Sequence, residues 1–166
     1  MPHAQDPPTL GEFNGFEIYP MPMFATLAVD DVSAVAAWYC EALGFATMFA
    51  GPPVGDQPSI VHLRRDKYQD VLLVPSRSRE AASPPASLTL SFSADEVDGL
   101  ADRARTVPPI GASAVVGPVD TPWNSRDLRV TDPVGHQLVF TCRQANPDPE
   151  QVKRMQQMFD AARKKA

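Results

Sequence analysis

The sequence has little of what marks several large classes of protein. It holds 2 cysteines and 3 histidines among 166 residues, with no CxxC pair and no cluster of Cys and His. A disulfide framework and a structural zinc site are therefore not expected. It also lacks an apolar run of about 18 residues, the length that a membrane-spanning helix needs, and its first residues have neither the basic nor the apolar part of a secretion signal. We expect a cytoplasmic protein that does not enter a membrane.

Positive charge is scarce as well. The chain has 15 Lys and Arg against 20 Asp and Glu, which gives a formal net charge of −5 at pH 7. Apart from Arg64 with Arg65 and Lys164 with Lys165, the basic residues are scattered. Nucleic-acid binding depends on clustered Lys and Arg that neutralise phosphates. The composition therefore predicts that no nucleic acid is a partner.

Two segments about half a chain apart resemble each other. Residues 24–32 read FATLAVDDV and residues 89–97 read TLSFSADEV. Each alternates like a short strand, reaches an acidic pair and enters a helix whose first apolar residue is a valine. Two copies are too few for a solenoid, so the duplication predicts two pseudo-symmetric halves of one domain. With 43% hydrophobic residues, the chain can fill a core of ordinary size.

Both halves show the pattern of a strand, a helix and three further strands. In the first half we expect strands over 24–29, 46–50, 59–65 and 70–74, with a helix that begins at Val32 and is closed by Gly44. In the second half we expect strands over 87–93, 112–116, 128–131 and 137–142, with a helix over 95–105. The acidic pairs are interpreted as helix caps rather than as catalytic carboxylates.

Composition also divides the chain into regions. Residues 1–22 are rich in proline and are expected to be an irregular arm, and 76–85 have the Ser, Ala and Pro content of a linker. The two repeats then cover 23–75 and 86–143. In the tail, 144–166, Asp148 and Pro149 predict the start of a helix. One face of that helix carries Val152, Met155, Phe159 and Ala162.

Two longer segments carry a resemblance to a known family. Residues 31–45 read DVSAVAAWYCEALGF, and residues 121–140 read TPWNSRDLRVTDPVGHQLVF. Both resemble the vicinal oxygen chelate superfamily, the group of glyoxalases, bleomycin-resistance proteins and extradiol dioxygenases. The resemblance covers residues 23–143. It implies an α+β fold of two tandem βαβββ repeats whose strands form an open, curved cup, usually within a dimer.

The resemblance also implies where a metal would be bound. Metal enzymes of this family present His or Gln from the first strand of each repeat and a carboxylate from the last. In this sequence the first-strand positions fall on Phe24 and Thr89, and the last-strand positions fall on Val139 and, in the first repeat, near Leu72. A phenyl ring and an isopropyl group do not bind a metal ion. We therefore expect neither a metal nor a cofactor.

The alternation of the strands indicates what lines the cup instead. Every second residue of a strand lies on the same face, and on the face toward the cup these residues are aliphatic, aromatic or hydroxyl-bearing. Such a surface suits a large, uncharged, partly aromatic ligand. Trp123 stands at a strand entry, where it either stacks on the ligand or only closes the mouth of the cup. The residues expected to bind the ligand are Phe24, Thr26, Phe49, His62, Thr89, Ser91, Trp123, Asn124, Arg126 and Val139.

Some of these residues also have a purely structural interpretation. His62 on an amphipathic strand can be a hydrogen-bonded or solvated residue, and Arg126 can be an exposed structural arginine. Trp38, on the first helix, is expected to lie in the core because aromatic residues of such a helix face the sheet.

Three functions fit the sequence. The leading hypothesis is a non-catalytic homodimer that sequesters a hydrophobic aromatic natural product, which we expect to be an antibiotic, and so protects its host. The alternative is a metal-dependent lyase, isomerase or dioxygenase of the same superfamily, with a displaced site built from His62, Asp70 or residues of a partner chain. The third is a scaffold without a small ligand.

Overall fold

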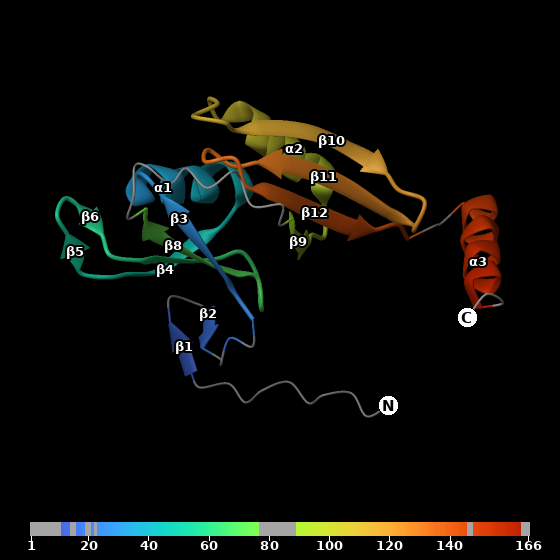
Figure 1. Ribbon diagram of the computed structural model, residues 1–166, viewed down its shortest axis with the longest axis horizontal. Helices are drawn as coiled ribbons and strands as arrows, with labels where there is room; N and C mark the ends of the chain where they lie inside the picture. The colour runs from blue at the N-terminus through green and yellow to red at the C-terminus, as the bar shows by residue number, and fades with distance from the viewer. Residues whose placement is uncertain are drawn as a thin grey trace. The chain divides into compact units, whose positions relative to one another are not determined.

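The chain divides into two compact units, Met1–Ala82 and Ser83–Ala166, each with its own sheet and helix (Figure 1). A computed structural model describes residues 11–13, 16–18, 21, 23–76, 89–145 and 148–163. The predicted linker, apart from Ser76, lies outside the described residues, as does most of the predicted arm. In the part of the chain that is described, no helix combines the length and the apolar character needed to cross a membrane.

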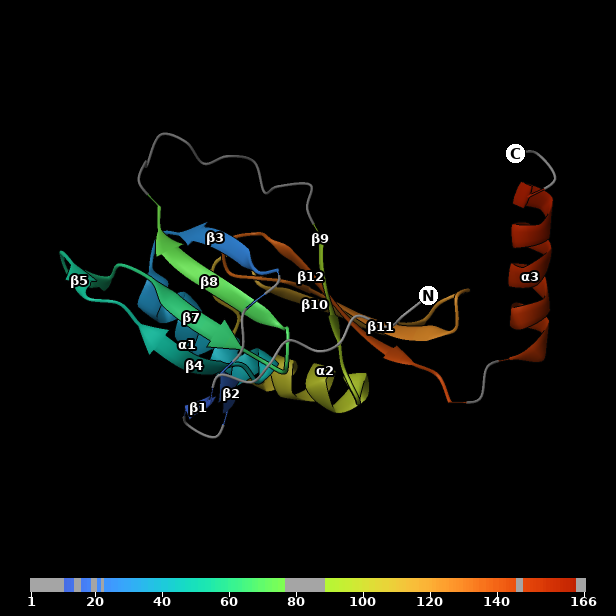
Figure 2. The ribbon, with the colours of Figure 1, turned by 90° about the horizontal axis from the view of Figure 1, so that it is seen from below.

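The first unit is a four-stranded sheet covered by one helix (Figure 2). Its elements are β3 (Ala25–Val29), α1 (Val32–Leu43), β4 (Ala46–Ala50), β7 (Val61–Arg64) and β8 (Asp70–Pro75). The strand order is β3-β8-β7-β4, with β3 parallel to β8 and the other pairs antiparallel. The predicted order of one strand, one helix and three strands is confirmed.

Helix α1 begins and ends where its local chemistry requires. The Asp31 carboxylate accepts a hydrogen bond from the Ala34 N–H at 2.8 Å, which satisfies an amide that has no partner within the helix. Gly44 closes the helix with φ 72°, a left-handed conformation that favours glycine. The buried side chains recur at helical spacing and include Val32, Val35 and Tyr39. Both boundaries predicted from the sequence are therefore confirmed.

The second unit repeats the same topology. Its elements are β9 (Thr89–Ser93), α2 (Val97–Thr106), β10 (Ala114–Asp120), β11 (Ser125–Thr131) and β12 (Gln137–Arg143). Strands β10, β11 and β12 lie side by side with α2 behind them (Figure 1), and the order is β10-β11-β12-β9, with β9 parallel to β12. The two sheets thus have one strand order, which confirms the internal duplication.

Several elements differ from the sequence-based expectation. Strand β10 was expected over 112–116 but runs from Ala114 to Asp120, across a bulge between Val116 and Val119 that contains Gly117 and Pro118. A bulge removes two residues from regular pairing, so it can accommodate a proline that cannot donate a hydrogen bond. Helix α2 starts at Val97 because Glu96, and not Asp95, caps it through the Gly99 N–H.

Two small hairpins and one terminal helix complete the described chain. The hairpins are β1 (Gly11–Phe13) with β2 (Phe16–Ile18), inside the predicted irregular arm, and β5 (Pro53–Val54) with β6 (Gln57–Pro58). Neither was predicted, because each strand is too short to show a periodic pattern. Helix α3 (Pro149–Arg163) begins after Asp148, whose carboxylate accepts from the Glu150 N–H, as the sequence predicted. The side chains of Met155, Phe159 and Ala162 lie outside the description.

Each sheet has one face against its helix and one face turned away from it, which we call its open face. Leu27 and Val29 of β3 and Phe92 of β9 are buried on the helix side. Thr26 and Ala28 of β3, and Thr89, Ser91 and Ser93 of β9, are exposed. The predicted alternation is therefore confirmed for both first strands.

Candidate ligand-binding site

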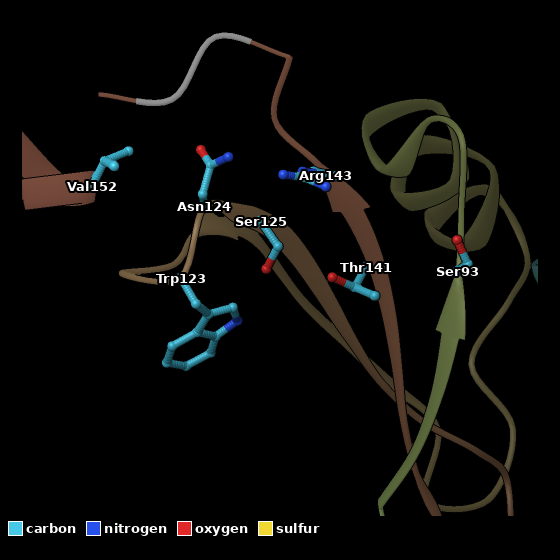
Figure 3. Close-up of a pocket in the computed structure, with 7 residues that line it drawn as sticks. All are labelled: Ser93, Trp123, Asn124, Ser125, Thr141, Arg143 and Val152. Carbon is cyan, nitrogen blue, oxygen red and sulfur yellow. The ribbon is translucent and has the colours of Figure 1, made fainter. Parts of the chain in front are cut away.

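The second unit has a pocket of about 420 Å³ at the ends of its strands (Figure 3). Its wall combines the end of β9, the turn before β11, the first residue of β11, the end of β12 and the first half of α3. A volume of this size lies within the ordinary range for small-molecule sites, about 300–1,000 Å³. The lining residues are Ser93, Trp123, Asn124, Ser125, Thr141, Arg143 and Val152.

Trp123 is presented to the pocket by a tight turn. The Thr121 N–H donates to the Ser125 carbonyl at 2.8 Å, and the Asn124 N–H donates to the Thr121 carbonyl at 3.3 Å. Asn124 adopts φ 66°, a left-handed conformation that asparagine tolerates better than most residues. The turn leaves the indole of Trp123 60% exposed. A large aromatic surface is thus available for contact with another molecule.

The floor beside Trp123 is a fixed polar network. Ser125 Oγ donates to Asp127 Oδ1 at 2.6 Å, and Thr141 Oγ1 donates to the same oxygen at 2.8 Å. Thr121 Oγ1 lies 2.9 Å from Ser125 Oγ. Asp127 is buried and therefore holds both hydroxyl groups in one orientation. The lone pairs of these hydroxyl oxygens can accept hydrogen bonds from a bound molecule.

Asn124 joins the turn to the end of β12. Its Nδ2 donates to the Gln144 carbonyl at 3.3 Å, and the Gln144 N–H donates to the Asn124 carbonyl at 3.2 Å. The Oδ1 atom is buried and has no hydrogen-bond partner among the described residues. Exchanging the oxygen and nitrogen of the amide would place two acceptors together at Gln144, so the contact fixes the orientation of the side chain.

Arg126 lies on the other side of the sheet. Its Nε and one terminal nitrogen donate to the two oxygens of Asp98, each at 2.8 Å, and its other terminal nitrogen donates to Asp120 at 2.8 Å. These bonds tie α2 to β10, and the Arg126 guanidinium lowers the pKa of the Asp98 carboxyl. The structure does not bring Arg126 together with Trp123 and Asn124 in the pocket.

Four of the predicted binding residues belong to the open face of the first sheet or to its edge. Phe24 and Phe49 are 46% and 56% exposed. The strand register places one residue from each strand in a row across this sheet, in the order Thr26, Leu72, His62 and Phe49. The corresponding row of the second sheet is Ser91, Val139, Arg129 and Val116. Thr89 lies on β9 two residues before Ser91, opposite Gln137.

Sequence reasoning found the pocket lining in part. Trp123 and Asn124 were expected to bind the ligand, and strand alternation turns Ser93 and Thr141 toward the cup. Ser125 was missed, although it lies two residues before Asp127 and so on the same face of β11. Arg143 was missed because it lies at a strand end, whose position the hydrophobic pattern locates only within a few residues. Val152 belongs to the tail, and no sequence signal links the tail to this pocket.

The positions that the family's metal enzymes use do not fit a metal in this chain. Leu72 and Val139 belong to the two rows and offer no ligand atom, and the exposed phenyl ring of Phe24 offers none either. The described residues contain no group of three or more His, Cys, Asp and Glu that could hold an ion.

His62 and Asp70, the displaced site considered from the sequence, are already engaged. His62 Nε2 lies 2.7 Å from Asp70 Oδ1, and Arg64 Nε lies 2.7 Å from the same oxygen. A divalent ion would have to separate this direct contact and share the oxygen with a guanidinium cation. This pair therefore does not fit a metal either.

Comparison with models of protein families identifies the superfamily of the chain. The model of the Glyoxalase/Bleomycin resistance protein/Dioxygenase superfamily matches residues 22–140. The chain belongs to this superfamily, in agreement with its duplicated topology. No curated protein shows significant sequence similarity to the chain.

Several solved structures share the fold. TioX from Micromonospora sp. ML1 is 22% identical, with a TM-score of 0.58 over 73% of this chain and 97% of that protein. The bleomycin resistance determinant of transposon Tn5 is 16% identical, with a TM-score of 0.56 over 75% and 98%. TnmS3 from Streptomyces sp. CB03234, described as an antibiotic-binding protein, is 26% identical, with a TM-score of 0.54 over 73% and 93%. The first two likenesses concern the fold alone.

Proposed function

We propose that this protein is a non-catalytic binder that sequesters a hydrophobic, aromatic natural product, an antibiotic, and so protects its host. The observation that carries the proposal is the pocket of the second unit, where the exposed indole of Trp123 stands beside the hydroxyl groups of Ser125 and Thr141. The likeness to TnmS3, an antibiotic-binding protein, supports the same class of ligand.

The chemistry of the surface favours binding over turnover. A flat aromatic ligand stacked on Trp123 would remove apolar area from water, worth about 25 cal/mol per Å² before the cost of association is subtracted. The hydroxyl groups would orient the ligand. The positions at which the family's metal enzymes hold their ion carry Phe24, Thr89 and Val139, which supports a role without metal chemistry.

Ligand contacts are proposed on each unit by itself. In the first unit they are Phe24, Thr26, Phe49 and His62, and in the second unit they are Thr89, Ser91, Trp123, Asn124 and Val139. Arg126 is not proposed as a ligand contact, because its guanidinium nitrogens already bind Asp98 and Asp120. We propose further that the protein is a homodimer, as the family resemblance implies.

The test is titration of the purified protein with a panel of aromatic antibiotics, followed by tryptophan fluorescence. Binding should quench the emission, and the ligand extracted from the complex should be chemically unchanged. Elemental analysis should find less than stoichiometric divalent metal. A modified product, or a metal ion that survives dialysis and supports turnover, would instead establish the enzyme alternative.

A further inference from the structure

The row across the first sheet combines an aromatic ring with a polar group of fixed orientation. Phe49 and Leu72 are the cross-strand neighbours of His62 on either side. Phe49 is largely exposed, whereas the His62 side chain retains only 16% of its accessible surface. The imidazole thus has two apolar neighbours in its row, and a flat molecule lying on Phe49 would reach it.

A buried ion pair holds the ring from one side. The side chain of Asp70 has no exposed surface, and that of Arg64 is 4% exposed. Asp70 Oδ1 receives Arg64 Nε and contacts His62 Nε2, both at 2.7 Å. Because the guanidinium neutralises the carboxylate, Asp70 is a charged acceptor that can be buried at this position.

This contact selects one tautomer of His62. In a neutral imidazole one nitrogen donates and the other accepts, and a carboxylate can bind only the donor. The hydrogen therefore resides on Nε2, and Nδ1 carries a lone pair. Nδ1 has no hydrogen-bond partner among the described residues and is not among the side-chain atoms sealed from solvent.

We infer that His62 Nδ1 is a preset hydrogen-bond acceptor that recognises a hydroxyl group on an aromatic ligand, with Asp70 and Arg64 as positioning residues. The inference rests on the proposed binding function and adds the ligand class, a phenol or a comparable ring-borne hydroxyl. The aromatic ring would lie against Phe49 and the hydroxyl would donate to Nδ1.

The tautomer can be measured without any ligand. Protein labelled with ¹⁵N at histidine, held above neutral pH, should show the His62 ring in the Nε2–H form by two-bond ¹⁵N–¹H correlation. The variant His62→Gln identifies its signals. A ring in the Nδ1–H form would overturn the inference, because Nδ1 could then only donate.

Recognition of the hydroxyl can be measured with a matched pair of probes, 9-phenanthrol and its methyl ether. Equilibrium dialysis should show the phenol binding about tenfold more tightly, the preference expected from one net hydrogen bond. His62→Phe keeps a ring but removes the acceptor, and Asp70 stays paired with Arg64, so the preference for the phenol should disappear. His136→Gln, which changes a histidine in the second unit, should keep the preference.

The outcomes separate the two ideas. If the wild-type protein binds both probes equally, the inference is wrong and the proposed binding of aromatic molecules stands. If the preference survives in His62→Phe, another residue binds the hydroxyl and the inference is again wrong. If neither probe binds, the proposed function fails for flat aromatic molecules, and recognition of their hydroxyl fails with it.

Discussion

Trp123 and Trp38 show how one residue type takes opposite roles in the two units. Trp38 lies on α1 with only 4% of its surface exposed and meets Tyr39 edge to face, with ring centroids 5.6 Å apart. Trp123 lies on a turn with 60% of its surface exposed. The core position predicted for Trp38 is confirmed. Because the two indoles differ in burial, substitution of Trp38 should affect stability and substitution of Trp123 should affect ligand binding.

Trp123→Ala should weaken binding of an aromatic antibiotic by about 1–3 kcal/mol, the loss expected for a stacked aromatic contact at a binding hot spot, and leave the free energy of unfolding unchanged. Trp38→Ala should instead lower the free energy of unfolding by about 3–5 kcal/mol, because it opens a cavity in the core. Ligand titration and urea denaturation of both variants provide the measurement.

The reverse pattern would contradict this assignment. If Trp38→Ala abolished binding at full stability while Trp123→Ala left both the affinity and the quenching intact, the ligand would not bind at the pocket of the second unit.

The second prediction at the residue scale concerns the contribution of the buried pair Arg64 and Asp70 to stability. Replacing Asp70 with Leu should lower the free energy of unfolding by about 3–5 kcal/mol, because it leaves a buried guanidinium without its counter-charge. The double variant Arg64→Met with Asp70→Leu should recover most of that loss, since apolar side chains can fill the same volume. Chemical denaturation of the three proteins measures the difference.

A matched control is the exposed pair of Arg126 and Asp98, whose replacement should change stability far less because solvent screens it. A double variant of Arg64 and Asp70 no more stable than Asp70→Leu would show that the loss comes from packing and not from charge.

At the scale of elements, the turn between β11 and β12 depends on one buried carboxylate. Asp132 Oδ1 accepts from the N–H groups of Val134, Gly135 and His136 at 2.8–2.9 Å, and Oδ2 lies 2.9 Å from His136 Nδ1. The hydrogen bond to Asp132 raises the pKa of His136 above its ordinary value of 6.5, although partial burial opposes the shift. Folding is therefore coupled to protonation of this ring.

The direction of the pH dependence follows from the raised pKa. A group that binds its proton more tightly in the folded state contributes its stability below the unfolded pKa and loses it as pH rises through the folded pKa. The stability difference between the wild-type protein and His136→Gln should thus be largest in mildly acidic solution and shrink above neutral pH. Denaturation curves across that range test it, and a difference that grows with pH would contradict the assigned pKa shift.

The helices and strands also show which parts of the fold can be predicted from the sequence. Helix α1 was predicted at both ends because Asp31 and Gly44 act locally, within one turn of the helix. The start of β11 was missed, since Ser125 and Asp127 are polar and their burial depends on hydroxyl partners across the sheet. Polar residues that satisfy one another in this way leave no hydrophobic period to detect.

The lining of the candidate pocket was predicted in part. Trp123 was expected at the mouth of the cup and Asn124 among the binding residues, and both line the pocket. Their contact with a ligand stays a prediction. Arg126 has the parity of Leu128 and Val130, which are fully buried on the helix side. Side chains two residues apart on a strand lie on the same face. A strand predicted to begin at Ser125 would therefore have placed Arg126 on the helix face.

At the scale of the whole molecule, the proposed assembly is a homodimer. Light scattering at micromolar concentration should give twice the monomer mass of 18.1 kDa. The physical reason is the exposed apolar surface of the described residues, such as Val116 at 63% and Val119 at 50% on the edge strand β10, because apolar side chains on a sheet edge favour contact with another chain. A stable monomer would contradict the proposal.

Removal of the tail after Asn146 separates two roles of α3. If the helix belongs to the dimer contact, the shortened protein should dissociate at concentrations where the full chain is dimeric. If it serves the pocket, the dimer should persist while the affinity for an aromatic antibiotic falls, because Val152 forms part of the pocket wall. We expect the second result. Val152→Ala in the full chain is the matched control, because it trims the pocket wall and keeps the helix. A tail deletion that alters neither the mass nor the affinity would show that α3 contributes to neither.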